Sequence, residues 1–171
     1  MRVLGIDCGT EFTGYGLVEE SAAGELVCVT CGTVELSRRE AMAQRLARVF
    51  AQLCSVLEHH RPDTAAIEDV FYSANVKSAI KLGQVRGVAM LAAAVHGCAV
   101  AEYSPLAIKS AVVGYGRAEK VQVQQMVTRL LRLPAPPKSL DACDALAVAI
   151  CHLHTAATTR RYSAAAAGNT K

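Results

Sequence analysis

Hydrophobic and polar residues follow two different periods along this chain, and together they predict a mixed α/β protein. Near the N-terminus, short apolar runs separated by the turn formers Gly9 and Gly24 predict three consecutive strands in a meander. Residues 40–60 instead repeat apolar side chains at three- and four-residue spacing, which predicts an amphipathic helix that stops at Pro62. The complete pattern predicts strands at 2–7, 13–19, 25–36, 64–70 and 98–103, and helices at 40–60, 75–96, 105–113, 118–132 and 139–156.

The order and number of these elements indicate one α/β domain. Strands dominate the first part and then alternate with helices, which is typical of a sheet flanked by helices. A chain of 171 residues with 52% hydrophobic content can bury one substantial core but leaves little room for a second domain. We therefore expect a folded domain at residues 1–157 and a disordered tail at 158–171, where small and polar residues show no periodicity.

The N-terminus and the cysteines both favour a cytoplasmic protein. The first ten residues include an aspartate and no long apolar run behind a basic start, so they predict neither a signal peptide nor a membrane anchor. Seven scattered cysteines are typical of reduced thiols, not of a disulfide framework. Cys28 and Cys31 have zinc-ligand spacing, but a regular strand would point them to opposite faces.

Four carboxylates lie where carboxylates are scarce, in or beside strongly apolar segments. Asp7, Glu68, Asp141 and Asp144 each lack an adjacent Lys or Arg. Because an ionised carboxylate without a partner is costly to bury, a bound cation would explain their presence. Oxygen ligands suit hard cations such as Mg²⁺, which is commonly held by a few carboxylates together with phosphate oxygens. The sequence therefore predicts metal-dependent phosphodiester chemistry.

The predicted elements can bring these acids together, although each position has an alternative interpretation. Asp7 and Glu68 end strands, where open α/β sheets build their sites, and the last helix carries the other two acids one turn apart. Asp141 also suits an ordinary helix start after Ser139. Asp69 rivals Glu68, because neighbours on a strand face opposite sides of the sheet.

Basic residues are concentrated in one part of the chain. The net charge is only +3, but basic residues outnumber acidic ones between Glu68 and Asp141, so one flank is expected to be positive and compatible with nucleic acid. This flank consists of Lys77, Lys81, Arg86, Lys109, Arg117, Lys120, Arg129, Arg132 and Lys138.

Four ordered segments resemble one known family. VLGIDCGT, IEDVFYSANVKSAIKLGQVRG, SAVVGYGRAEKVQVQQMV and DACDALAVAI are similar to motifs of the RuvC family of bacterial Holliday-junction resolvases, and the resemblance extends from residue 2 to residue 156. It implies a ribonuclease-H-like fold with a mixed five-stranded sheet flanked by helices. It also implies a homodimer that resolves four-way DNA junctions by paired nicks in homologous recombination and DNA repair, with RuvA and RuvB as partners. Cys8 departs from the family, which commonly has Pro there, and this could loosen the turn after Asp7.

The resemblance assigns roles to individual residues. Its four metal-binding acids fall on Asp7, Glu68, Asp141 and Asp144, which favours Glu68 over Asp69, and it implies two Mg²⁺ ions per subunit, with Mn²⁺ able to substitute. The expected DNA-binding residues are Phe71, Tyr72, Asn75, Lys77, Lys81, Lys109 and Lys120.

These DNA-binding assignments differ in what supports them. The family uses the Phe71 position as an aromatic that wedges or stacks at the branch point. Lys109 and Lys120 match positions near the scissile phosphate. Lys77 and Lys81 also fit the solvated face of an amphipathic helix.

One further pattern and three competing functions remain open. Ala79, Gly83 and Gly87 recur every four residues in helix 75–96, so another helix, from this chain or a partner subunit, could approach it closely. The N-terminal motif also resembles sugar kinases and actin-like ATPases, which need two domains of this kind, more than this length provides. A non-catalytic ribonuclease-H-like binding module and a YqgF-type protein would share much of the same pattern.

Overall fold

The computed structural model describes residues 1–69 and 76–168, which form a five-stranded mixed sheet with helices on both faces. The strand order is β3-β2-β1-β4-β5. The first three strands pair antiparallel, whereas β4 pairs parallel to both β1 and β5. The expected sheet is thus confirmed, and its strands are β1 (Arg2–Asp7), β2 (Phe12–Glu20), β3 (Leu26–Glu35), β4 (Thr64–Glu68) and β5 (Ala99–Tyr103).

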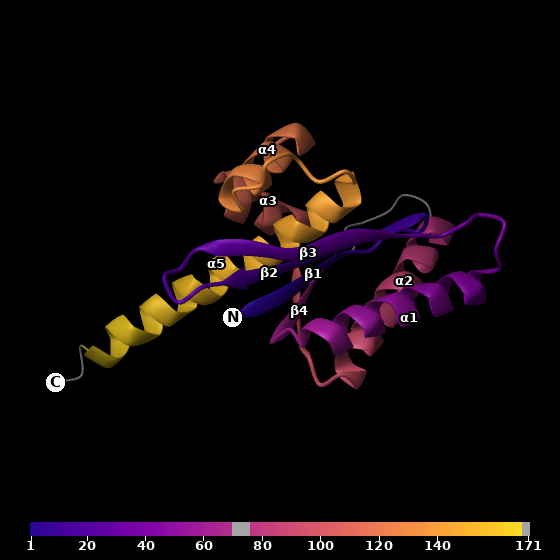
Figure 1. Ribbon diagram of the computed structural model, residues 1–171, viewed down its shortest axis with the longest axis horizontal. Coiled ribbons are helices and arrows are strands. Elements are labelled where there is room, and N and C mark those ends of the chain that lie inside the picture. The colour runs from indigo at the N-terminus through magenta and orange to yellow at the C-terminus, as the bar shows by residue number, and fades with distance from the viewer. Residues whose placement is uncertain (70–75, 169–171) are drawn as a thin grey trace.

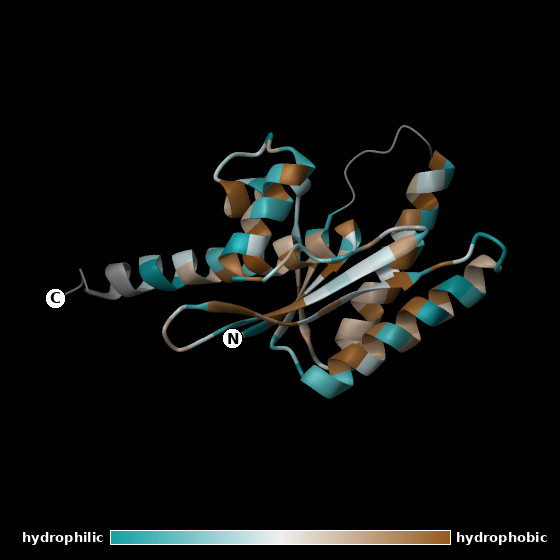
Figure 2. Cartoon of the chain, turned by 45° about the horizontal axis from the view of Figure 1, so that its top comes forward, coloured by the Kyte–Doolittle hydropathy of each residue, from teal (hydrophilic) through white to brown (hydrophobic). Residues whose placement is uncertain are grey.

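The helices divide into two layers (Figure 1). Helices α1 and α2 cover one face of the sheet, and α3, α4 and α5 lie on the other. Along α1, hydrophobic and hydrophilic residues are interleaved (Figure 2), as its period predicts. The helices are α1 (Met42–His60), α2 (Val76–Val95), α3 (Pro105–Val113), α4 (Lys120–Leu130) and α5 (Leu140–Gly168).

Alternation along the central strands decides which side chains face which layer. In β1, Leu4 and Ile6 pack in the α1/α2 core, whereas Val3 packs in the α5 core. The period of two therefore puts Asp7 on the α5 side. In β4, Ala66 belongs to the α5 core and Ile67 to the α1/α2 core. Glu68 accordingly shares the α5 face with Asp7.

Helix α5 lies directly on the backbone of β1 and β2, because the residues beneath it are glycines. A Cβ atom at Gly5 would lie 1.9 Å from the carbonyl oxygen of Ala145, and one at Gly14 would lie 2.0 Å from that of Asp141. Real Cβ atoms do not approach so closely, so only glycine permits this packing. Gly14 pairs with Asp7 in the sheet register, so the approach carries the start of α5 to the Asp7 strand end.

A β-bulge changes the expected orientation of two cysteines. The register of β2 against β3 shifts between Leu17 and Val18, which pair with Thr30 and Cys28, so the bulge adds one residue to β3. Cys28 and Cys31 consequently both pack against the α5 core, not on opposite faces as a regular strand would require. All seven cysteines are free.

The C-terminal segment differs from the sequence-based expectation. Residues 158–168, predicted to be disordered, continue α5, which projects past the sheet (Figure 1). The sequence of this segment has no periodic apolar face, which is the feature that predicts a packed helix. The alanine run at 164–167 nevertheless has a high helix propensity, and this does not require an apolar face. Arg160 on this extension pairs with Glu20 of β2 at 2.6 Å.

Helices α2 and α5 are long and apolar enough to meet the length and composition of a membrane span. Core helices of soluble domains meet the same test. The apolar residues of α5 pack against β1, β2 and the neighbouring helices, and α2 carries Lys77, Lys81 and Arg86 along its length. The composition of α5 is therefore explained by its place in the core, whereas several apolar residues of α2 remain exposed.

Substituting Gly14 by Ala tests the packing of α5. The new methyl group would overlap the Asp141 carbonyl oxygen, so we expect a loss of roughly 2–4 kcal/mol of stability. Thermal unfolding of Gly14→Ala against wild type measures this loss. The packing argument is wrong if the variant unfolds at the wild-type temperature.

Candidate active site

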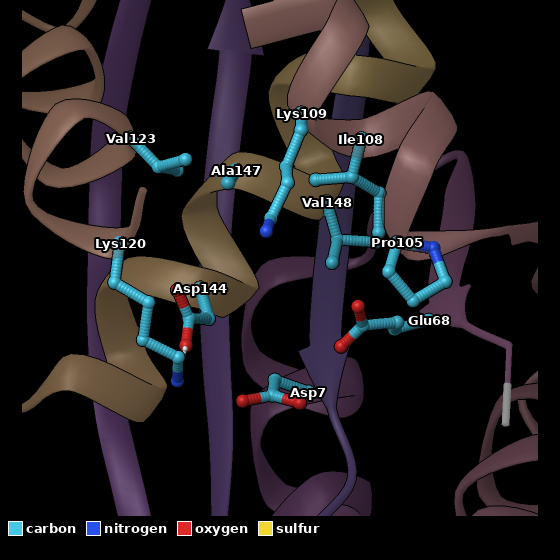
Figure 3. A pocket seen from close by; sticks show the side chains of 10 residues that line it. All are labelled: Asp7, Glu68, Pro105, Ile108, Lys109, Lys120, Val123, Asp144, Ala147 and Val148. Atoms are coloured by element: carbon cyan, nitrogen blue, oxygen red, sulfur yellow. Dashed lines mark hydrogen bonds and ion pairs between the residues drawn. The ribbon is translucent and has the colours of Figure 1, made fainter. Parts of the chain in front are cut away.

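Three carboxylates from three different elements line one pocket. Asp7 and Glu68 come from the carboxyl ends of the adjacent parallel strands β1 and β4, and Asp144 comes from the first turns of α5. Their side chains are directed toward a common space of about 250 Å³ (Figure 3). Apolar side chains of α3, α4 and α5 form much of the remaining wall, including Ile108, Val123 and Val148.

Asp141 lies at the edge of this group and is oriented by a neighbour. Its Oδ2 accepts a hydrogen bond from the Ser139 hydroxyl at 3.1 Å, and Ser139 also caps the first turn of α5 by accepting from the Ala142 amide. Asp141 is nevertheless close enough to repel Asp7 electrostatically. The two interpretations of Asp141 are therefore compatible, because it is a helix-start residue that also faces the acidic group.

Burial and mutual repulsion make this group of acids unfavourable by itself. Burial, followed by repulsion from Glu68 and Asp144, raises the pKa of Asp7 to about 8. Burial also raises the pKa of Glu68, while its hydrogen bond with Asp7 lowers it. Without a cation, the pair formed by Asp7 and Glu68 therefore retains a proton in the hydrogen bond between the two carboxyl groups.

Two lysines face the same acids. The Nζ of Lys120 lies 3.1 Å from Asp144 Oδ2, and this hydrogen bond raises the pKa of Lys120 (Figure 3). Lys109 lines the pocket from α3, a helix whose start is fixed by Pro105 and by a hydrogen bond from the Ala107 amide to Ser104. Both lysines thus lie where a phosphate group at the acids would find a positive charge.

Glu68 and Asp69 face opposite sides of the sheet, and Asp69 pairs there with the side chain of Arg86. Glu68 lies in the pocket, whereas Asp69 Oδ1 lies 3.3 Å from Nη2 of Arg86 on α2. Arg86 also pairs with Glu102 of β5. Arg86 belongs to the expected positive flank, but here its charge is balanced by these two carboxylates.

Of the other expected DNA-binding residues, those that the structure describes are separate from the pocket. Lys77 and Lys81 are exposed on α2 and do not line it. Phe71, Tyr72 and Asn75 lie outside the described residues. The side-chain contacts of Ser139, Asp69 and Glu102 were not predicted from the sequence. A hydroxyl two residues before an acid forms no distinctive pattern, and neither does a single carboxylate at or near the end of a strand.

The residues present fit a hard divalent cation. The donors are carboxylate oxygens, and a cation would relieve the repulsion that raises the pKa of Asp7. Within residues 1–69 and 76–168, no three His, Cys, Asp or Glu side chains are already arranged as a metal-binding cluster. The hydrogen bond between Asp7 and Glu68, and the ion pair of Asp144 with Lys120, account for this arrangement.

The raised pKa of Asp7 predicts a pH-dependent cost to stability. Between the ordinary pKa of an aspartate and about 8, the folded state binds a proton that the unfolded state releases. The free energy of unfolding is therefore highest at low pH and falls as pH rises toward 8. In EDTA, Asp7→Asn should therefore be more stable than wild type near pH 8, by roughly 2 kcal/mol or about 4–8 °C.

The measurement is thermal unfolding across this pH range. The advantage of Asp7→Asn should shrink toward about pH 4, where the wild-type carboxyl is also neutral. Equal unfolding temperatures of the two proteins near pH 8 would show that the Asp7 environment is not destabilising.

Comparison with known proteins identifies relatives of this chain. The sequence profile described as crossover junction endodeoxyribonuclease RuvC matches residues 3–152. The crossover junction endodeoxyribonuclease RuvC of Koribacter versatilis is 60% identical, with 97% of this chain and 100% of the relative covered. The protein of the same name from Acidobacterium capsulatum is 54% identical over 92% of this chain and 96% of its own.

The fold gives the same result. The structure of Thermus thermophilus RuvC in complex with a Holliday junction substrate has a TM-score of 0.85 and 30% identity, and the match covers 92% of this chain and 96% of that one. The chain therefore matches its relatives over nearly their whole length, unlike one half of a two-domain kinase. On the family profile, the sequence identities and the shared fold, this chain belongs to the RuvC family.

Proposed function

We propose that this protein is a divalent-metal-dependent endonuclease that resolves four-way DNA junctions in homologous recombination and DNA repair. The observation that carries the proposal is the convergence of Asp7, Glu68 and Asp144 with Lys109 and Lys120 in one pocket. Nucleases of the RuvC family depend on divalent metals, and the Thermus thermophilus relative was solved with a Holliday junction substrate.

The four acids would hold two Mg²⁺ ions, for which Mn²⁺ can substitute. When bound between carboxylates and a phosphodiester, such ions activate a water and stabilise the departing 3′ oxygen. Asp7 ends the central strand between the other acids, which suits it to bind both ions. The proton on Asp7 must leave as a cation binds, so cation affinity should rise with pH up to about 8.

The lysines have a separate part in this proposal. Lys120 neutralises Asp144 in the absence of metal. A cation bound to Asp144 would compete with Lys120, which is then free to pair with a DNA phosphate beside the acids. Lys109 faces the same space from α3 and would bind an adjacent phosphate oxygen.

The remaining DNA contacts lie on the segment after β4. Lys77 and Lys81, exposed on α2, would bind phosphates of the junction arms. We assign Phe71 to stacking at the branch point, with Tyr72 and Asn75 beside it, as the family resemblance implies.

We propose that the protein is a homodimer that pairs through α2. One exposed side of α2 forms an apolar stripe of Val76, Ile80, Gly83, Gly87, Leu91 and Val95, in which the four larger side chains are 54–70% exposed. The two glycines have open space in front of them, so a second helix could pack closely there. Resolution needs two nicks, and a twofold dimer supplies two equivalent sites on a nearly twofold junction.

The family also implies RuvA and RuvB as partners, and we place the reaction in the cytoplasm, with no membrane involved. A DNA substrate and branch-migration partners require this location. Seven free thiols are consistent with a reducing compartment.

The function is tested by cleavage of a synthetic four-way junction against a linear duplex, with Mg²⁺ and with EDTA. Wild type should nick only the junction, and only with the metal. Asp7→Asn and Asp144→Asn should each lower the rate by at least about 10³-fold, because each removes a metal ligand. Junction binding in EDTA should remain near the wild-type level, since the acids hold metal and do not attract phosphates. Cleavage at the wild-type rate by either variant would remove that residue from the ligand set.

The dimer is tested by placing a charge in the α2 stripe. Leu91→Glu should shift the protein from dimer to monomer in sedimentation equilibrium, because a buried unpaired carboxylate destabilises an apolar interface. Val27→Glu is the control, since Val27 has a similar exposure of 52% on β3, outside the stripe. An unchanged dimer in Leu91→Glu would exclude α2 from the interface.

A further inference from the structure

A partly buried arginine lies behind the candidate metal ligands, on the opposite face of the sheet. Arg86 comes from the middle of α2, and its side chain is only 17% exposed. No DNA phosphate at the acids could meet it there, because the sheet lies between. A charge this deeply placed is costly unless it is paired.

Arg86 joins the end of β4, which carries Glu68, to the end of the neighbouring strand β5. Its Nη2 lies 3.3 Å from Asp69, the residue after Glu68, and it also contacts Glu102. Glu102 is paired in the sheet with Ile67, the residue before Glu68. The Asp69 amide further donates to the Tyr103 carbonyl at 2.8 Å. The residues on both sides of Glu68 are thus linked to β5, directly or through Arg86.

Side chains alternate along a strand, so the neighbours of Glu68 lie on the face of the sheet opposite to Glu68 itself. Holding Ile67 and Asp69 in place on the α2 side therefore also holds Glu68 in place on the α5 side.

We propose that Arg86 is a positioning residue for the metal-binding carboxylate Glu68, acting through Asp69 and Glu102. This inference rests on the proposed metal-dependent function. Both contacts are made by Nη2 of the guanidinium, and a lysine ammonium, with a different shape and reach, would not reproduce their geometry. Partners behind metal ligands are known to set metal affinity in this way.

The test measures Mn²⁺ binding without DNA, by electron paramagnetic resonance of the free ion. Arg86→Lys and Glu102→Asp both keep the charge, so a weaker affinity in either reports lost geometry and not lost electrostatic attraction. We expect about tenfold weaker Mn²⁺ binding in each variant. Junction nicking should be slow at low Mn²⁺ and should recover toward the wild-type rate at saturating Mn²⁺.

Two control variants separate positioning from stability. Arg2→Lys changes a similar Arg–Glu pair, with Glu19, at the other end of β1, and should bind Mn²⁺ like wild type. Val85→Ala, next to Arg86 in the α1/α2 core, should lower the unfolding temperature without changing Mn²⁺ affinity. If Arg86→Lys does not fold, Glu102→Asp decides the question.

The outcomes are distinct. Wild-type Mn²⁺ affinity in a folded Arg86→Lys or Glu102→Asp variant overturns the positioning role, as does an equal loss in Val85→Ala. Asp7→Asn serves as the reference for the site itself. If Asp7→Asn binds Mn²⁺ as tightly as wild type, the proposed metal site is wrong, and that failure is distinguishable from a failure of Arg86 alone.

Discussion

The direct contact between helix α5 and the backbone of the sheet is the constraint on which the site depends. Gly5, Gly14 and Gly16 leave no side chains between α5 and the two central strands, so the helix axis lies closer to β1 and β2 than ordinary residues allow. Because Gly14 is the sheet partner of Asp7, this contact brings Asp141 and Asp144 to the end of β1. Side-chain packing elsewhere then holds an arrangement that the acids themselves oppose.

Electrostatic repulsion among the acids, together with their burial, is the main property of the site. Burial and repulsion raise the pKa values of both Asp7 and Glu68, and the nearby Lys120 and Lys109 offset these shifts only in part. The folded chain therefore contains an unfavourable interaction that a divalent cation would relieve. On the other face of the sheet the signs are reversed, because Arg86 is a partly buried cation balanced by Asp69 and Glu102.

Helix α2 makes a different kind of contact on each of its sides. Val85, Ala89 and Ala92 pack on the sheet, Arg86 reaches the strand ends behind the acids, and the apolar stripe remains open to a partner. The segment between β4 and α2 carries the residues assigned to the branch point. A dimer through α2 would therefore connect the subunit interface, the metal ligands and the DNA surface through one rigid helix.

The sequence by itself determined most of the secondary structure and the candidate acids, because both depend on local patterns of residues. Apolar periods of two and near four located the strands and helices that the structure describes. Carboxylates within apolar segments singled out Asp7, Asp141 and Asp144, with Glu68 and Asp69 as alternatives until the family resemblance favoured Glu68. It also marked α2 as a helix open to close packing, through the spacing of Gly83 and Gly87.

Tertiary structure alone decided which neighbours those residues meet, because such contacts depend on register and on distant segments. Asp69 was separated from Glu68 by Arg86, seventeen positions along the chain. A bulge turned Cys28 and Cys31 to the same face, since one extra residue reverses the alternation of a strand. The extension of α5 through residue 168 needed no buried face, so the pattern that finds packed helices could not find it.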